Sequence, residues 1–438
     1  MTSNATELAA SRWSDLWRVE DWWAVWFGFM LLIAVVAGVI DTVPKVGQWT
    51  VSPLDSMPAT VAIRLIFLAC GLAALTGLGV AISGGGSLRE YSTGFAGVFI
   101  LAVVAYLFAG QTTVREYGLG YALWALVLGL LISNTVGAPA WLRAGARSEL
   151  FIKTGLVLLG AEILFGNIVS LGPPGLLVAW VVTPLVIISM YYFGVRWLQI
   201  RSKALIITIA AATSVCGVSA AIAAAAASGA KREELSLAVA ITMAFTVIMM
   251  IALPAVCRLM ELDPVVAGAW IGGTVDATGA VVAAGAALGG EAETTAAVVK
   301  MVQNMLIGII AFAITVYWVT VVERNPEGSR ANPMEIWRRL PKFILGFVAA
   351  SLIFSFALIP AMGGDAVAAD LKVTKTFRSW FFCLAFVSIG LESNFRALMG
   401  QLERGKPLVL YVVGQTLNVV LTLAMAWLAF GVLYEVAK

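Results

Sequence analysis

The sequence predicts an all-α membrane protein that crosses the bilayer many times. Of its 438 residues, 61% are hydrophobic and 12% are charged, and the mean hydropathy is +0.95. Such a composition does not fit a water-soluble surface. A spanning helix takes about 20 apolar residues, so crossings use up most of the chain and leave no sizeable soluble domain.

Charges, prolines and glycine clusters divide the sequence into about thirteen apolar stretches. They lie at residues 22–40, 60–83, 93–110, 118–137, 151–169, 174–198, 203–228, 233–256, 264–289, 296–321, 342–361, 377–393 and 407–432. Most of the 28 Lys and Arg residues fall on segments that share a side with the N-terminus. Because cytoplasmic loops are rich in these residues, we expect the N-terminus inside and the C-terminus outside.

Several functional classes are disfavoured by composition. The net charge of +3 is small and scattered, which does not suggest a nucleic-acid partner. The chain has no histidine, which excludes His-ligated metals and His-based catalytic triads. The four cysteines lie singly, without the spacing of a metal site, and no nucleotide-binding P-loop is present. We therefore expect no metal, no organic cofactor and no enzymatic activity.

The stretches divide into a three-helix extension, residues 1–117, and two five-helix units, residues 118–258 and 259–438. Each unit has an odd number of crossings, so the second enters the membrane from the opposite side, as in an inverted repeat. The fourth helix of each unit carries a small polar interruption, at residues 213–219 and 388–394. We expect both helices to be broken there and to cross.

A break in mid-bilayer leaves backbone groups that lipid cannot satisfy, so it persists only beside a cavity or other protein. The half-helix that starts at the break presents N–H groups and a positive dipole end to an anion. In residues 203–228 the break is expected at Cys216-Gly217, because glycine tolerates unusual backbone angles. The hydroxyls of Thr213, Ser214 and Ser219 would then bond to freed backbone groups. The alternative is an unbroken helix whose hydroxyls bond back to their own carbonyls.

The second interruption, in residues 377–393, contains Ser388, Gly390, Glu392 and Ser393. The carboxylate of Glu392 would coordinate Na⁺ with neighbouring oxygens or carry a proton. Alternatively, Glu392 lies at the cytoplasmic interface and pairs with Arg396 four residues on.

A third polar stretch, in residues 264–289, contains Gly273, Thr274 and Asp276. Such residues are costly in lipid, so they should face an aqueous cavity or another helix. Asp276 is the strongest candidate for binding a coupling ion, and its alternative role is a structural hydrogen-bond hub.

Lys300 lies inside the next predicted helix, with Gln303 and Asn304 one turn further on. Its ammonium would neutralise a bound anion or pair with Asp276, unless the side chain extends to the membrane interface. Gln415 and Asn418 are second-rank candidates for lining a cavity.

Several short motifs together resemble the sulfate exporter family, the YeiH-like proteins. They are Ser214-Val215-Cys216-Gly217, Ile271-Gly272-Gly273-Thr274-Val275, Val281-Val282-Ala283-Ala284-Gly285, Val299-Lys300-Met301 and Gly390-Leu391, in order between residues 118 and 432. The resemblance implies a fold related to bile-acid sodium symporters and cation/proton antiporters, with alternating access. It marks Cys216-Gly217 and Gly390-Leu391 as the crossover, implies a bacterial cytoplasmic membrane, and is compatible with a homodimer.

The leading interpretation is a secondary transporter of a small anion, such as sulfate, sulfite or a sulfonate, coupled to H⁺ or Na⁺. The residues expected to bind the anion are Thr213, Ser214, Cys216, Gly217, Ser219, Gly273, Thr274, Lys300, Asn304, Gly390 and Ser393, and those expected to bind the coupling ion are Asp276 and Glu392. Many family members carry a histidine and then an acid where this chain has Asp276 and Ala277, which leaves the identity of the anion open. A Na⁺/proton antiporter is the alternative, and a membrane-embedded enzyme is a third interpretation.

Overall fold

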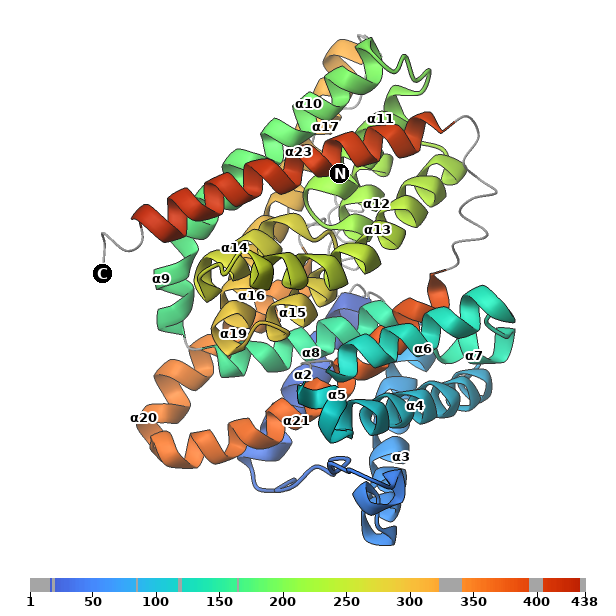
Figure 1. Cartoon of the computed structure of the whole chain (residues 1–438), viewed down its shortest axis with the longest axis vertical. Helices are drawn as coiled ribbons and strands as arrows, with labels where there is room; N and C mark the ends of the chain where they lie inside the picture. The colour runs from blue at the N-terminus through green and yellow to red at the C-terminus, as the bar shows by residue number, and fades with distance from the viewer. Residues whose placement is uncertain are drawn as a thin grey trace, which may run out of the picture. The chain divides into compact units, whose positions relative to one another are not determined.

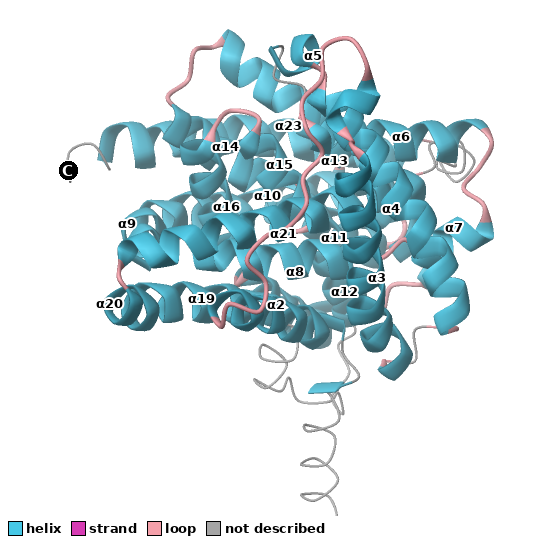
Figure 2. Ribbon diagram, turned by 90° about the horizontal axis from the view of Figure 1, so that it is seen from below, coloured by secondary structure: helices cyan, strands magenta, loops and turns pink. Residues whose placement is uncertain are grey.

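The computed structural model describes residues 16–17, 20–83, 86–116, 120–163, 165–322, 341–393 and 405–433. Over these residues the chain is helical and forms no strand, as Figure 2 shows. The one extended pairing in this part of the chain is an isolated bridge between Trp49 and Gln111. The prediction of an all-α protein is confirmed.

The helices form two compact units. Unit 1 comprises Met1–Phe165 and Lys342–Asn394, and unit 2 comprises Gly166–Pro341 and Phe395–Lys438. Each unit therefore draws helices from both predicted five-helix repeats. The inverted repeat and its boundaries at residues 117 and 258 stay predictions.

Unit 1 is built mainly around the long helix α21. Its elements are α2 (Glu20–Val36), η1 (Pro53–Ser56), α3 (Ala59–Ile82), α4 (Leu88–Gly110), α5 (Thr112–Glu116), α6 (Tyr121–Thr135), α7 (Ala140–Gly145), α8 (Ser148–Glu162), α19 (Lys342–Ile353), η4 (Phe354–Leu358), α20 (Ile359–Met362) and α21 (Gly364–Glu392). Helix α21 packs on α6, α8 and α4 (Figure 1). The same helices supply most of the buried apolar side chains of this unit.

Unit 2 contains two pairs of short helices enclosed by longer ones. Its elements are α9 (Phe165–Leu176, which begins at the unit boundary), η2 (Leu177–Val181), α10 (Val182–Arg196), α11 (Lys203–Ser214), α12 (Gly217–Ser228), α13 (Arg232–Leu259), α14 (Pro264–Thr274), α15 (Thr278–Ala286), α16 (Gly290–Asn304), α17 (Leu306–Tyr317), η3 (Trp318–Val322), α23 (Lys406–Ala426) and η5 (Trp427–Leu433). The short pairs are α11 with α12 and α14 with α15. Helices α10, α13, α16 and α23 pack around them (Figure 1).

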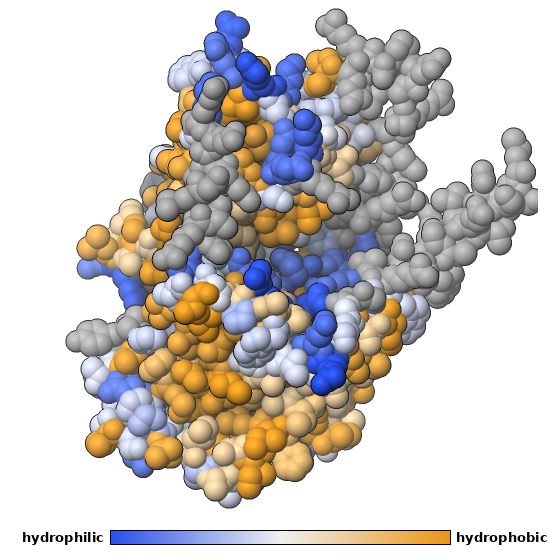
Figure 3. Space-filling model, turned by 90° about the vertical axis from the view of Figure 1, so that its right-hand side faces the viewer, coloured by the Kyte–Doolittle hydropathy of each residue, from blue (hydrophilic) through white to orange (hydrophobic). Residues whose placement is uncertain are grey.

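Seven helical segments of the described chain are long and apolar enough to cross a membrane. They are Ala59–Ile82, Leu88–Gly110, Ile168–Arg196, Glu233–Leu259, Gly290–Val322, Lys342–Met362 and Lys406–Leu433. Large apolar side chains are exposed on many helices, and they cover much of the face drawn in Figure 3, as expected for contact with lipid. A polytopic helical protein is thus confirmed, whereas the number of thirteen spans is not. Two predicted spans, residues 203–228 and 264–289, are each divided into two short helices, and a short helix cannot span a bilayer alone.

The predicted second break is wrong, because α21 continues without interruption through Ser388 and Gly390 to Glu392. The hydroxyls of Ser388 and Ser393 donate to carbonyls four residues earlier in the chain, at 2.8 and 2.7 Å. They therefore satisfy no freed backbone group. Asn394, the last residue of the predicted interruption, lies outside the described residues.

Gly390 has a packing role where α21 crosses α6. A Cβ atom at this position would lie 2.5 Å from the Leu126 carbonyl oxygen and 2.8 Å from Gly129 Cα. Both contacts are to backbone, so a side chain at residue 390 would force the two helices apart. The small residue in this motif thus permits close helix packing.

Replacing Gly390 with alanine is therefore expected to lower the free energy of unfolding by about 1–3 kcal/mol, the usual cost of overpacking. Gly364→Ala is the matched control on the same helix, because a Cβ atom there meets nothing within 4 Å. The midpoint of thermal unfolding in detergent measures both changes. Equal midpoints for the two variants would contradict the close crossing.

Candidate functional site

The first interrupted element confirms the break predicted at Cys216-Gly217. Helix α11 ends at Ser214 and α12 begins at Gly217, and Val215 and Cys216 between them are not helical. The alternative of one unbroken helix is wrong. The hydroxyls of Thr213 and Ser214 nevertheless donate to carbonyls four residues earlier, at 2.8 and 2.7 Å. Thus they do not bond to the freed groups as predicted, while Ser219 lies half-buried in the first turn of α12.

The second interrupted element is α14 with α15, and no break was expected within residues 264–289. Helix α14 ends at Thr274 and α15 begins at Thr278, with residues 275–277 between them. Asp276 therefore lies in the break itself. Glycines position α14 against α16: a Cβ atom at Gly268 would lie 2.5 Å from the Ala292 carbonyl oxygen.

The two breaks contact each other directly. The backbone N–H of Gly217 donates to the backbone carbonyl of Asp276 at 2.6 Å. The Cys216 sulfur lies 3.8 Å from the Thr278 hydroxyl. A Cβ atom at Gly217 would lie 2.8 Å from the Thr242 Cγ2 atom, so glycine allows this close approach. The predicted crossing of residues 203–228 with residues 377–393, marked by Cys216-Gly217 and Gly390-Leu391, is therefore wrong, because α21 is unbroken. The break after α11 instead meets the break between α14 and α15.

Carbonyl groups at the breaks bind buried polar side chains from neighbouring helices. These carbonyls belong to Thr213 and Ser214 of α11, to Val215 in the break, and to Gly273 and Thr274 of α14. Their donors are Asn418 for Thr213 (3.2 Å), Thr183 and Gln303 for Ser214 (3.1 and 3.0 Å), Lys300 for Val215 (2.5 Å), Gln303 for Gly273 (3.1 Å) and Gln415 for Thr274 (3.1 Å). These contacts replace the helix hydrogen bonds that the breaks remove, which lipid could not do.

Gln303 joins the two interrupted elements through one side-chain amide. Its Nε2 atom lies within hydrogen-bond distance of carbonyls on both α11 and α14, and its Oε1 atom accepts from Lys300 at 2.7 Å. The side chain is 2% exposed. One residue of α16 therefore holds the carbonyl ends of both short helices.

Lys300 is fully enclosed in unit 2, with 1% of its surface exposed. Its ammonium donates to the Val215 carbonyl and to Gln303. The alternative in which the side chain extends to the membrane interface is therefore wrong. The carbonyl end of a helix carries partial negative charge, and the ammonium lies against that end of α11.

Asp276 is the acidic partner in this environment and is also 1% exposed. The Tyr411 hydroxyl on α23 donates to its Oδ2 atom, while its Oδ1 atom is buried without a hydrogen-bond partner. Asp276 and Lys300 interact electrostatically without a direct ion pair. The predicted pairing of the two side chains is thus an interaction at longer range.

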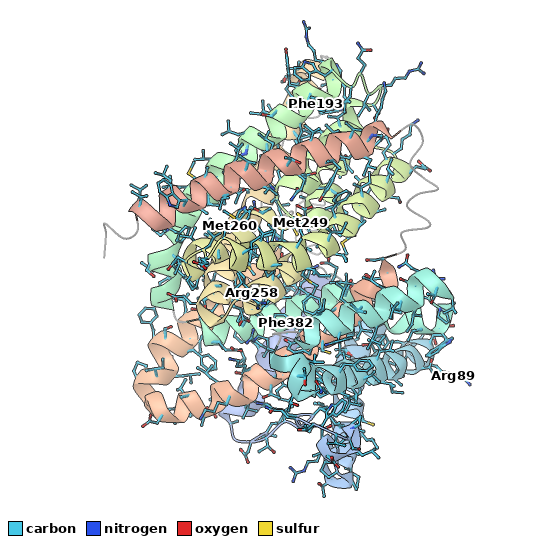
Figure 4. All side chains as sticks on the ribbon, in the orientation of Figure 1. Arg89, Phe193, Met249, Arg258, Met260 and Phe382 are labelled. Atoms are coloured by element: carbon cyan, nitrogen blue, oxygen red, sulfur yellow. The ribbon has the colours of Figure 1, made fainter. Side chains whose placement is uncertain are left out.

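Buried oxygen atoms near the second break also lack partners. Asn304 donates to the Thr278 hydroxyl at 3.0 Å, and its Oδ1 atom has no hydrogen-bond partner. The hydroxyl of Thr274 and the Oε1 atom of Gln415 are likewise unsatisfied. Gln415 also lies 2.8 Å from the sulfur of Met249, which is labelled in Figure 4. Unpaired buried acceptors are costly, so proton donors or cations would bind here favourably.

Comparison with known proteins identifies the family. The model for conserved hypothetical protein 698 matches residues 93–411, which include both breaks, Lys300 and Tyr411. The chain belongs to the conserved hypothetical protein 698 family.

Relatives of this chain are named as membrane proteins. A UPF0324 membrane protein of Rhodopirellula baltica is 50% identical over 400 residues, covering 89% of this chain and 72% of the relative. One from Nitratidesulfovibrio vulgaris is 48% identical over 383 residues, covering 86% of this chain and 66% of the relative. One from Nitrosomonas europaea is 28% identical, covering 92% and 93% of the two chains. No solved structure matches the chain.

The chain spans about two thirds of the length of the Nitratidesulfovibrio relative and somewhat more of the Rhodopirellula one. Membership of the conserved hypothetical protein 698 family establishes a membrane protein. Sulfate export and the relationship to bile-acid symporters stay predictions.

Three predicted site residues lie outside the four short helices of the crossing, and their role in binding stays a prediction. Gly390, Glu392 and Ser393 lie in unit 1. The Ser133 hydroxyl lies within 2.9 Å of the Gly390 and Ser393 carbonyls, and the Ser148 hydroxyl donates to the exposed Glu392 at 2.7 Å. Arg396, the partner predicted for Glu392, lies outside the described residues. The structure thus gives these three residues contacts with α6 and α8.

The crossing also contains residues that sequence reasoning missed. Tyr411 and Thr183 carried no signal, because single hydroxyls are common in apolar helices. The sequence placed Gln303 one turn from Lys300 on the same helix face, but its link to both breaks depends on tertiary structure. Gln415 and Asn418, ranked second from the sequence, both contact break carbonyls.

Proposed function

We propose that the chain is a secondary transporter that works by alternating access, with its substrate site at the crossing in unit 2. The observation that carries the proposal is the burial of Asp276 and Lys300 where two interrupted helices meet. Ionisable side chains inside membrane proteins are costly and usually functional. Helices broken near the bilayer midplane are typical of transporter binding sites.

A small anion, such as sulfate, sulfite or a sulfonate, is the substrate class we propose. Helices α12 and α15 both begin at the crossing, and neither N-terminus has a side-chain cap. The first N–H groups of a helix have no partner within it and carry partial positive charge. The N–H of Gly217 already donates to the Asp276 carbonyl. The other first-turn N–H groups of α12 and α15, together with the Lys300 ammonium, favour a small anion. We treat the protein as a carrier in the bacterial cytoplasmic membrane, without enzymatic activity or cofactor.

Asp276 is the group we propose for the coupling ion, which is H⁺ or Na⁺. A buried carboxylate needs a proton, a metal ion or an ammonium group to offset the cost of its charge. Its unpartnered Oδ1 atom is available to either ion. Occupancy of this atom would offset the carboxylate charge and so favour binding of an anion nearby.

A cation/proton antiporter is the second candidate, favoured by the unpartnered oxygens of Asp276, Asn304, Thr274 and Gln415. Oxygen atoms of these kinds are typical ligands of hard cations. In this reading Asp276 exchanges H⁺ for Na⁺ and no anion moves.

Flux measurements in proteoliposomes distinguish the two candidates. Labelled sulfate, sulfite, taurine and small dicarboxylates are supplied with and without Na⁺ or pH gradients. Gradient-dependent uptake of one of these anions is the expected result. Proton movement that requires Na⁺ alone would select the antiporter. Absence of any flux under every gradient would defeat both proposals.

A further inference from the structure

A cavity in unit 1 lies among the loop after α2, the C-terminal part of α4, the start of α6 and the middle of α21. Its volume is about 250 Å³. For scale, an engineered apolar cavity of about 150 Å³ holds benzene. We propose that this cavity binds a small organic anion: a flat ring that carries one anionic group. The proposal does not depend on the transport function assigned to unit 2.

The charge of the cavity favours an anion. Lys45 and Lys375 both line it, and no acidic side chain does. Neither lysine makes an ion pair or a side-chain hydrogen bond in the described part of the chain. Two ammonium groups without a counter-charge at one cavity favour a carboxylate or sulfonate between them.

The aromatic wall of the cavity favours a flat ring. Tyr106 and Tyr121 stack with ring centroids 4.9 Å apart, and Tyr106 lies 4.6 Å from Trp380. Trp380 is 1% exposed, and its indole N–H donates to the Pro44 carbonyl at 3.0 Å. This bond holds the loop that carries Lys45 against α21. The wall is therefore formed in advance, which reduces the ordering cost of binding.

Two hydroxyl groups at the cavity favour ring-containing anions that carry a hydrogen-bond donor. Thr376 and Ser379 donate to backbone carbonyls four residues earlier, at 2.9 and 2.8 Å. Their hydrogens are thus engaged, and their oxygens present lone pairs. A ligand with a hydroxyl or amino group on its ring should therefore bind more tightly than one without.

Equilibrium binding of labelled 4-hydroxybenzoate to the full-length protein in phosphatidylcholine nanodiscs tests the proposal. Saturable binding is expected, with weaker competition from benzoate and still weaker competition from inorganic phosphate, which has no ring. The double variant Lys45→Gln/Lys375→Gln should weaken binding at least tenfold. Lys372→Gln is the matched control, because this exposed lysine lies on α21 outside the cavity lining, and it should change affinity less than twofold.

Absence of saturable binding to the wild type would overturn the assignment, as would equal weakening by the double variant and by Lys372→Gln. Displacement of the probe by phosphatidylglycerol, but not by phosphatidylcholine, would assign the cavity to a lipid headgroup and overturn the choice of a soluble anion. Size-exclusion profiles matching that of the wild type establish that the variants are folded. Because the altered lysines are exposed, folding should be retained.

Discussion

Replacing Asp276 with asparagine is expected to reduce transport by at least about 100-fold, equivalent to about 2.7 kcal/mol. Asparagine cannot take up a proton or supply a negative charge. It retains an oxygen that can accept a hydrogen bond from the Tyr411 hydroxyl, so the contact with α23 is kept. Lys300 would lose the acidic group with which it interacts electrostatically. The measurement is the initial rate of uptake in proteoliposomes of the solute that the wild type transports.

Glu291→Gln is the control for this substitution, because it removes an exposed carboxylate from the first turn of α16. It should leave the rate within twofold of the wild type. Thermal unfolding of both variants separates loss of transport from loss of fold. A folded Asp276→Asn variant that transports at the wild-type rate would exclude Asp276 from ion coupling.

Replacing Gln303 with leucine is expected to cause the largest loss of stability. The substitution leaves the Ser214 and Gly273 carbonyls without the amide donor and removes the Oε1 atom that accepts from Lys300. Each buried polar group left unsatisfied costs about 1–3 kcal/mol. The free energy of unfolding therefore falls by about 2–6 kcal/mol if two of three groups, the Ser214 carbonyl, the Gly273 carbonyl and the Lys300 ammonium, become unsatisfied. Thr183 continues to donate to the Ser214 carbonyl, which favours the lower part of that range.

Reversible unfolding in mixed detergent and denaturant measures this loss. Thr294→Val is the matched control on the same helix, because its hydroxyl donates to the Gly290 carbonyl near the exposed end of α16. Its effect should stay within about 0.5 kcal/mol. If the two variants unfold at the same denaturant concentration, the amide of Gln303 does not stabilise the crossing.

The sequence permitted prediction of the helical membrane class and of one break. At Cys216-Gly217, a small flexible residue follows Thr213 and Ser214, and the break occurs where that pattern indicated. The reason given for it was partly wrong, because both hydroxyls bond within α11. The freed carbonyls at the end of α11 and at Val215 in the break accept from Gln303, Asn418 and Lys300 instead. The side chains that bond to the freed carbonyls come from α16 and α23, so a motif within residues 213–219 could not reveal them.

Missing tertiary contacts also explain why the break predicted in residues 388–394 was wrong. Ser388, Gly390 and Ser393 resemble an interruption in composition, yet their hydroxyls bond back to the helix and the glycine packs on α6. The real second break, at Val275–Ala277, contains one charged residue, Asp276, whose importance was predicted although its backbone conformation was not. The cavity in unit 1 was not predictable from local sequence either, because Lys45 and Lys375 come together only in the folded chain.

The link formed by Gln303 limits which movements the proposed transport cycle could use. One amide joins the carbonyl ends of α11 and α14, and a backbone hydrogen bond joins Gly217 to Asp276. Sliding one short helix past another would break both connections among side chains that are buried in unit 2. Exchange of solute between the two sides of the membrane should therefore leave these four helices in a fixed mutual arrangement and displace them as a rigid body.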